Sequence, residues 1–183
     1  ELLGEYAERQ AASRRVLIAG IMAMVVIFFI LLMSLGSWRL ATMSFLSLPI
    51  ALVGGVLAAY IASNGILSLG SLVGFLTILG IAVRNSIMLI SHYQHLEKFE
   101  GETFGPKLVL RGAKERLAPI MMTALTTGLA LLPLVIAGNI AGHEIEHPMA
   151  IVILGGLVTS TFLNLFLVPS LYLRFGHGWK LAT

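Results

Sequence analysis

The sequence predicts an all-α membrane protein with about five transmembrane helices. The chain of 183 residues is 57% hydrophobic and only 11% charged, and its mean hydropathy is +0.93. Soluble domains carry about 25% charged residues, and a domain of this size has too little interior to hide so much apolar surface. Lipid must therefore cover part of the chain, and within lipid only helices or closed barrels satisfy their backbone hydrogen bonds.

Five apolar stretches are long enough to cross a membrane, because a helix needs about 20 residues to span the hydrocarbon core. The pairs Gly36-Ser37, Asn64-Gly65 and Gly138-Asn139 are typical turn sequences and follow the first, second and fourth stretches. The predicted spans are Val16–Leu35, Leu40–Ala62, Leu69–Ser91, Pro119–Ala137 and Met149–Leu173.

Two polar segments flank or separate the spans. The apolar run Val16–Leu35 is about 20 residues long and is followed by Gly-Ser-Trp-Arg, so we interpret it as a span and not as a signal peptide. Because residues 1–15 are polar and do not begin with Met, we expect them to be the end of an external domain and a lead-in helix within a longer chain. Residues 92–118 separate the third and fourth spans. Within them, 107–117 carry apolar side chains on one helical face and basic ones on another. This pattern predicts an amphipathic helix on the membrane surface, and a solvated connector is an equally good interpretation.

The distribution of Lys and Arg predicts the orientation, because these residues concentrate in cytoplasmic loops. Five crossings place eight of the twelve on one side and three, all within 1–15, on the other, while Arg84 lies inside a span. We therefore predict that 92–118 and the tail 174–183 are cytoplasmic and that 1–15 is periplasmic. The eight are Arg39, Lys98, Lys107, Arg111, Lys114, Arg116, Arg174 and Lys180.

Arg84 is the most informative residue, because ionisable side chains within membrane spans are costly and usually functional. It calls for a carboxylate partner, yet the nine acidic residues are all Glu and none lies in a predicted span. The partner is expected in another part of the protein or in another chain. The alternative is that Arg84 extends its guanidinium to the cytoplasmic interface.

Small and hydroxyl side chains recur within the spans. Thr123 lies near the start of the fourth span, where its hydroxyl either belongs to a hydrogen-bonded relay or bonds back to its own helix. The pairs Gly54-Gly55 and Gly155-Gly156 permit close packing of helices.

A motif between the last two spans raises a second function class. His143, Glu144 and His147 match the H-E-x-x-H pattern of zinc proteases, but that chemistry needs both His on one helical face and a third ligand. Because Gly142 and Pro148 bracket the motif, we expect a polar external loop and assign no metal site. The sequence has no Asp, no Cys, no Walker A loop and no basic patch with interleaved aromatics, so no cofactor or nucleic acid is predicted.

Several segments, in order along nearly the whole chain, resemble the resistance–nodulation–division (RND) efflux permeases. The sequences of these segments are most similar to those of the heavy-metal branch. The resemblance implies the last five spans of the second-half helical repeat in a multi-pass protein of the bacterial inner membrane. It further implies a homotrimer that works with a periplasmic adaptor and an outer-membrane channel. The segments are Gly36–Arg39, Leu48–Gly55, Gly80–Ile87, Arg116–Ala124 and Pro148–Gly156.

The resemblance implies proton-driven efflux of metal cations or of small toxic compounds, which makes the protein a secondary transporter and not an enzyme. Arg84 occupies the family's basic relay position with Asn85 beside it, and Arg116 and Thr123 match two further relay positions. Many drug pumps have Lys where this chain has Arg84. The acidic relay residues would lie in the missing N-terminal half. Two alternatives stay open: an intramembrane zinc protease, and a structural membrane subunit in which Arg84 only docks a partner helix.

Overall fold

The computed structural model describes residues 2–63, 68–138, 140 and 142–176, with side chains described from Gln10 onwards. The described residues form helices and no strand. Five helical segments are long and apolar enough to cross a membrane, which confirms the predicted fold class. The helices are α1 (Leu2–Leu35), α2 (Trp38–Ser63), α3 (Leu69–Phe99), α4 (Pro106–Ala137), α5 (Glu146–Phe162), the π-helical segment η1 (Leu163–Leu167) and α6 (Val168–Phe175).

The helices extend beyond the predicted spans where the sequence contains no helix breaker. The lead-in belongs to α1, which begins at Leu2. The segment 92–118 is not a separate surface helix, because α3 continues to Phe99 and α4 begins at Pro106. Residues 107–117 are rich in good helix formers, and α4 continues from them through Pro119 into the span that follows. The predicted turn at Asn64-Gly65 and the tail residues 177–183 lie outside the described residues.

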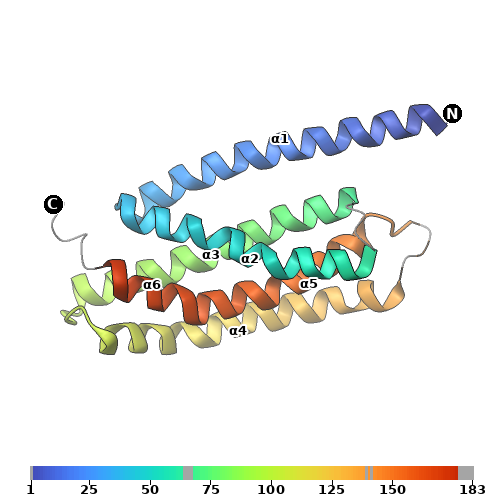
Figure 1. Cartoon of the computed structure of the whole chain (residues 1–183). Coiled ribbons are helices and arrows are strands. Elements are labelled where there is room, and N and C mark those ends of the chain that lie inside the picture. Colours follow the sequence, from blue (N-terminus) through green and yellow to red (C-terminus); the bar gives the residue numbers. More distant parts are fainter. Residues whose placement is uncertain (1, 64–67, 139, 141, 177–183) are drawn as a thin grey trace.

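The helices pack side by side in an elongated bundle (Figure 1). Helices α2, α3 and α5 form its centre, with α1 along one side and α4 along the opposite side. Residues 100–105 join α3 to α4 at one end of the bundle, which we call the connector end. The end of α6 and the turn from α1 to α2 lie at this same end (Figure 1).

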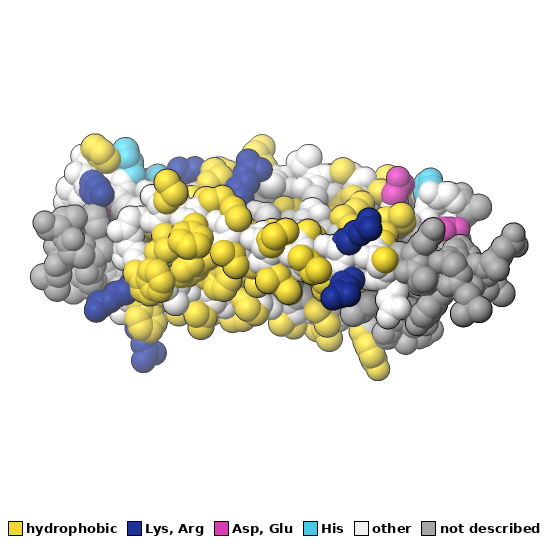
Figure 2. All heavy atoms as spheres, turned by 90° about the horizontal axis from the view of Figure 1, so that it is seen from above, with side chains coloured by type: hydrophobic (Ala, Val, Ile, Leu, Met, Phe, Trp, Pro, Cys, Tyr) yellow, Lys and Arg dark blue, Asp and Glu magenta, His cyan; other side chains and the backbone are white. Residues whose placement is uncertain are grey.

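The outer helices present apolar side chains to their surroundings. Only 6% of the most apolar window of α1 is buried, against 50% for α3. On α1, Ile21 is 66% exposed and Met33 is 87% exposed. Figure 2 shows apolar side chains covering the middle of the face that α1 presents. A continuous apolar surface of this extent requires lipid or another protein against it.

Helices α2 and α5 approach until their backbones touch. A methyl group built on Gly54 would lie 2.3 Å from the carbonyl oxygen of Gly155, and one built on Gly155 would lie 2.5 Å from the carbonyl oxygen of Gly54. Thr159 adds a hydrogen bond across the same contact, donating from Oγ1 to the carbonyl oxygen of Ala51 at 2.8 Å. The close packing expected from these glycines is confirmed.

This contact gives a stability prediction for Gly155→Ala. The added methyl group must push α5 away from α2, and overpacking of this kind costs about 1–3 kcal/mol. Gly80→Ala is the matched control, because a methyl group at Gly80 meets nothing within 4 Å. Thermal unfolding of the purified protein in detergent should show a lower midpoint for Gly155→Ala and an unchanged or higher one for Gly80→Ala. Equal midpoints would contradict the packing described.

The fifth membrane-crossing segment contains one wide turn. Within η1 the backbone N–H of Val168 donates to the carbonyl oxygen of Leu163, five residues earlier. A π turn takes up about one residue more than an α turn. The insertion lies where Asn164, a fully buried amide, faces α3.

Candidate functional site

Four residues expected from the sequence to act together line one small cavity between α3 and α4. Arg84 and Asn85 come from the middle of α3, Arg116 comes from the first half of α4, and Thr123 lies just past the middle of α4. The cavity has a volume of about 100 Å³; we call it the relay cavity. Its other lining residues are Met88, Leu89, Pro119 and Ile120.

Arg84 faces outward from the helices of this chain. Its side chain is exposed, and among the described residues it has no hydrogen-bond acceptor and no ion-pair partner. Asn85 beside it is only 8% exposed. An arginine at this depth in an apolar helix needs a counter-charge, and the open side of Arg84 is where an additional helix would supply it.

Thr123 and Arg116 lie one above the other on α4. Thr123 Oγ1 donates to the carbonyl oxygen of Pro119 at 2.9 Å, which is the back-bonding alternative considered for this residue. That bond uses the hydroxyl proton and leaves the oxygen lone pairs free to accept. Arg116 is partly buried, and its Nη2 lies 3.5 Å from Nδ1 of His92 on α3.

A network of charged side chains continues from Arg116 toward the connector end. His92 Nε2 lies 2.7 Å from Oε2 of Glu115. Arg111 then donates to Glu115 at 3.0 Å, to Glu102 at 2.8 Å and to Glu100 at 2.5 Å. Sequence reasoning missed this network, although the spacing of four residues between Arg111 and Glu115 on one helix was a signal for part of it.

A second polar contact lies deeper in the bundle and was also missed. Ser86 Oγ donates to Oδ1 of Asn164 at 3.2 Å, and Asn164 Nδ2 donates to the carbonyl oxygen of Ser160 at 2.8 Å. Asn164 is 1% exposed and Ser86 is 2% exposed. A single amide inside an apolar span was the available signal, because buried polar groups in membranes pair across helices.

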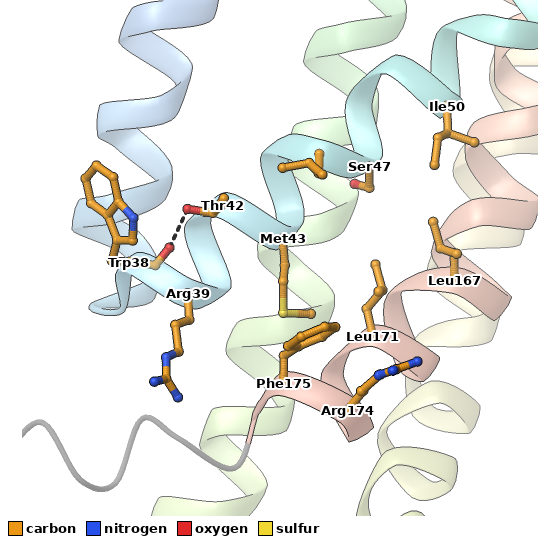
Figure 3. Close-up of a pocket in the computed structure, with 11 residues that line it drawn as sticks. Trp38, Arg39, Thr42, Met43, Ser47, Ile50, Leu167, Leu171, Arg174 and Phe175 are labelled. Atoms are coloured by element: carbon orange, nitrogen blue, oxygen red, sulfur yellow. Dashed lines mark hydrogen bonds between the residues drawn. The ribbon is translucent and has the colours of Figure 1, made fainter.

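The largest cavity described lies elsewhere and contains none of the four predicted residues. It is a groove of about 980 Å³ between α2 and α6. Figure 3 shows Met43 and Ile50 on one wall and Leu167 and Leu171 on the other, with Arg39 and Arg174 at the connector end. The walls of this groove are predominantly apolar. The candidate site is therefore the relay cavity and not the larger groove.

The H-E-x-x-H motif does not form the helical arrangement of a zinc protease. His143 lies before α5 and His147 is the second residue of that helix. His147 Nδ1 lies 3.1 Å from the carbonyl oxygen of Leu134. Glu144 also precedes the helix. The two His and the Glu therefore do not share one helical face, as a zinc protease would need. This geometry argues against the zinc protease alternative.

Comparison with known proteins identifies the family. The model of the AcrB/AcrD/AcrF family matches residues 1–176. The chain belongs to this family. The resemblance to RND permeases of the heavy-metal branch is thereby confirmed, and the family consists of efflux transporters and not of enzymes.

The proteins to which this chain is similar include both metal and drug resistance proteins. The chain is 37% identical over 169 residues to the nickel and cobalt resistance protein CnrA of Cupriavidus metallidurans, covering 92% of this chain and 15% of CnrA. It is 36% identical over 129 residues to the multidrug resistance protein MdtC of Escherichia coli, covering 70% of this chain and 12% of MdtC. A crystal structure of a heavy metal efflux pump matches with a TM-score of 0.75 and 30% identity, covering 94% of this chain and 17% of that one. The chain thus spans about an eighth to a sixth of the length of these proteins.

Proposed function

We propose that this chain is the membrane part of a proton-driven efflux transporter, an antiporter that exchanges protons for its substrate. The observation that carries the proposal is the relay cavity, where Arg84, Arg116 and Thr123 gather between two otherwise apolar helices. Because Arg84 has no acidic partner among the described residues, the acids that carry the proton belong to the part of the transporter outside this chain.

The favoured substrate is a metal cation. CnrA is named for resistance to nickel and cobalt, and the matching crystal structure is titled a heavy metal efflux pump. MdtC, named for multidrug resistance, keeps a small organic substrate as the second candidate. Both candidates use the same membrane part, since substrate selection and energy coupling lie in different regions of RND transporters.

The substrate prediction is tested by tolerance in cells. A sensitive bacterial strain that expresses the full-length transporter should tolerate more Co²⁺, Ni²⁺, Zn²⁺ or Cd²⁺ than the strain with an empty vector. A protonophore should abolish the efflux of the preloaded cation, because export depends on the proton gradient. Tolerance to organic toxins without tolerance to any of the four cations would select the second candidate.

The proposed orientation places the connector end in the cytoplasm of a bacterial inner-membrane protein. A cysteine introduced at Glu144, between α4 and α5, should react with a membrane-impermeant maleimide added to intact cells. A cysteine at Lys107, near the start of α4, should react only after the membrane is permeabilised. The chain has no native cysteine, so no background labelling arises from it. Labelling at Lys107 in intact cells would reverse the orientation.

The proposed assembly is a homotrimer that works with a periplasmic adaptor and an outer-membrane channel. The apolar face of α1 supports contact with lipid or a neighbouring subunit, because its exposed side chains are continuous along the helix. Cross-linking of the full-length transporter in the membrane should yield species up to the trimer.

A further inference from the structure

His92 lines a second cavity of about 510 Å³, on the connector side of the relay cavity; we call it the outer cavity. Met88 and Arg116 line both cavities, so the two cavities adjoin at these side chains. The outer cavity is also lined by Ser91, His92, His95 and Glu100.

The two ring nitrogens of His92 have different partners. Arg116 Nη2 lies 3.5 Å from Nδ1, and Glu115 Oε2 lies 2.7 Å from Nε2. A guanidinium only donates, so Nδ1 must be the accepting nitrogen and Nε2 must carry the proton that is donated to the carboxylate. The ring accordingly accepts through Nδ1 from Arg116, which lines the relay cavity, and donates through Nε2 to Glu115.

Solvent exposure increases from His92 to Glu115. The His92 side chain is 14% exposed, while its partner Glu115 is 40% exposed. The ring is thus sheltered between α3 and α4, and the carboxylate next to it reaches solvent. Arg111 holds Glu115 from the far side through a bond of 3.0 Å, which fixes the carboxylate in place without covering it.

We propose that His92 transfers protons between the relay cavity and the cytoplasmic surface. This inference rests on the proposed function, which supplies the protons. When the long Arg116 contact opens, a proton released inside the relay cavity binds to Nδ1 and gives an imidazolium, which repels the cation of Arg116 and is stabilised by Glu115. The proton on Nε2 then passes to the Glu115 carboxylate and from there to water. The ring is then protonated on Nδ1. After it turns in the outer cavity, solvent takes the proton from Nδ1 and another solvent proton binds to Nε2, so the starting tautomer returns and one net proton passes per cycle.

Charged and titratable groups from both helices surround the ring. From α4, Arg116 opposes the imidazolium and Glu115 favours it, with Arg111 bound to Glu115. From the α3 side, His95 and Glu100 line the same outer cavity. Histidine is the side chain suited to this role because its ordinary titration range includes neutral pH.

The test separates proton transfer from a purely structural bond between α3 and α4. The full-length transporter is reconstituted into vesicles, and Co²⁺ flux driven by a proton gradient is measured while the pH on the connector side varies from about 5.5 to 8. His92→Gln keeps a side-chain N–H for Glu115 but binds no proton. It should lower the flux by about 100-fold, as expected for loss of a proton-transfer group, and flatten the pH profile. The matched control is His95→Gln, which changes the other His of the outer cavity and should keep both rate and profile.

A second variant guards against a folding defect. Glu115→Gln keeps an oxygen for the His92 bond but accepts no proton, and because Glu115 is on the surface it should fold normally and reproduce the slow flux. If the unmodified transporter shows coupled flux and both variants keep its rate and pH profile, the role of His92 is wrong while the proposed function stands. Absence of proton-coupled flux of any candidate substrate in the unmodified transporter would instead overturn the proposed function, and the role of His92 with it.

Discussion

Arg84→Ala should abolish export while the transporter still inserts into the membrane. In the proposed cycle Arg84 pairs with carboxylates of another helix, and the charge-assisted contact holds the helices together while the acids are ionised. Arginine keeps its proton at every physiological pH, so the acids alone are protonated and deprotonated. Without the cation, the acids would hold their protons too tightly to release them. We expect a loss of about 100-fold or more in efflux, as for other groups that control proton transfer.

The conservative variant Arg84→Lys gives the control for charge. Lysine keeps the positive charge but lacks the planar fork that binds a carboxylate through two parallel hydrogen bonds. Partial efflux is therefore expected. Efflux of the preloaded cation from cells is the measurement, with the amount of each variant in the membrane checked by immunoblot. If Arg84→Ala inserts normally and exports at the wild-type rate, the guanidinium merely reaches the membrane interface and the relay role is wrong.

Thr123→Val should slow efflux about tenfold, which corresponds to one lost hydrogen bond of about 1.4 kcal/mol in the rate-limiting step. Valine has nearly the shape of threonine but offers no oxygen to the relay cavity. Thr123→Ser restores the hydroxyl and should restore most of the rate. The measurement is the initial rate of substrate efflux at a fixed proton gradient.

The chain provides a matched control one helical turn away. Thr126 Oγ1 bonds back to the carbonyl oxygen of Met122 at 2.7 Å, as Thr123 does to Pro119 at 2.9 Å, but Thr126 does not line the relay cavity. Thr126→Val removes the same kind of back-bond and should leave efflux unchanged. Equal effects of the two valine variants would mean that the Thr123 hydroxyl acts only within its own helix.

The five spans were predictable from the sequence because the length of an apolar run is set by the thickness of the membrane. The ends of the helices were not predictable in the same way. The polar residues before Val16 and after Ser91 continue the helices, since a helix stops only where a residue or a contact breaks it and polarity alone does neither.

The relay cavity was predictable only in part. Charge marked Arg84, because it is the one basic residue inside a predicted span. Periodicity cannot place Arg116 and Thr123 against it, since they lie on another helix, and here the family resemblance supplied the pairing. Neither route indicated His92 or Asn164, whose partners lie 23 and 78 residues away along the chain. Such contacts depend on how whole helices rotate against one another.

The wide turn η1 controls that rotation for the last membrane segment. Asn164 contacts Ser86 on α3, and Tyr172 donates from its hydroxyl to Oε1 of Glu97, also on α3, at 3.0 Å. Eight residues separate Asn164 from Tyr172. In a regular α-helix eight residues exceed two turns by about 80°, so one of the two side chains would miss α3.

One α turn of 3.6 residues and one wide turn of about one residue more make very nearly eight residues. The segment therefore completes two whole turns between Asn164 and Tyr172 and brings both side chains onto one line. η1 thus accommodates one extra residue: with a single residue removed, seven residues of regular α-helix would turn through about 700°, close to two whole turns, and Tyr172 would stay in line with Asn164. The alignment of the two polar contacts with α3 thus depends on the wide turn that takes up the extra residue, as well as on the side chains that make the contacts.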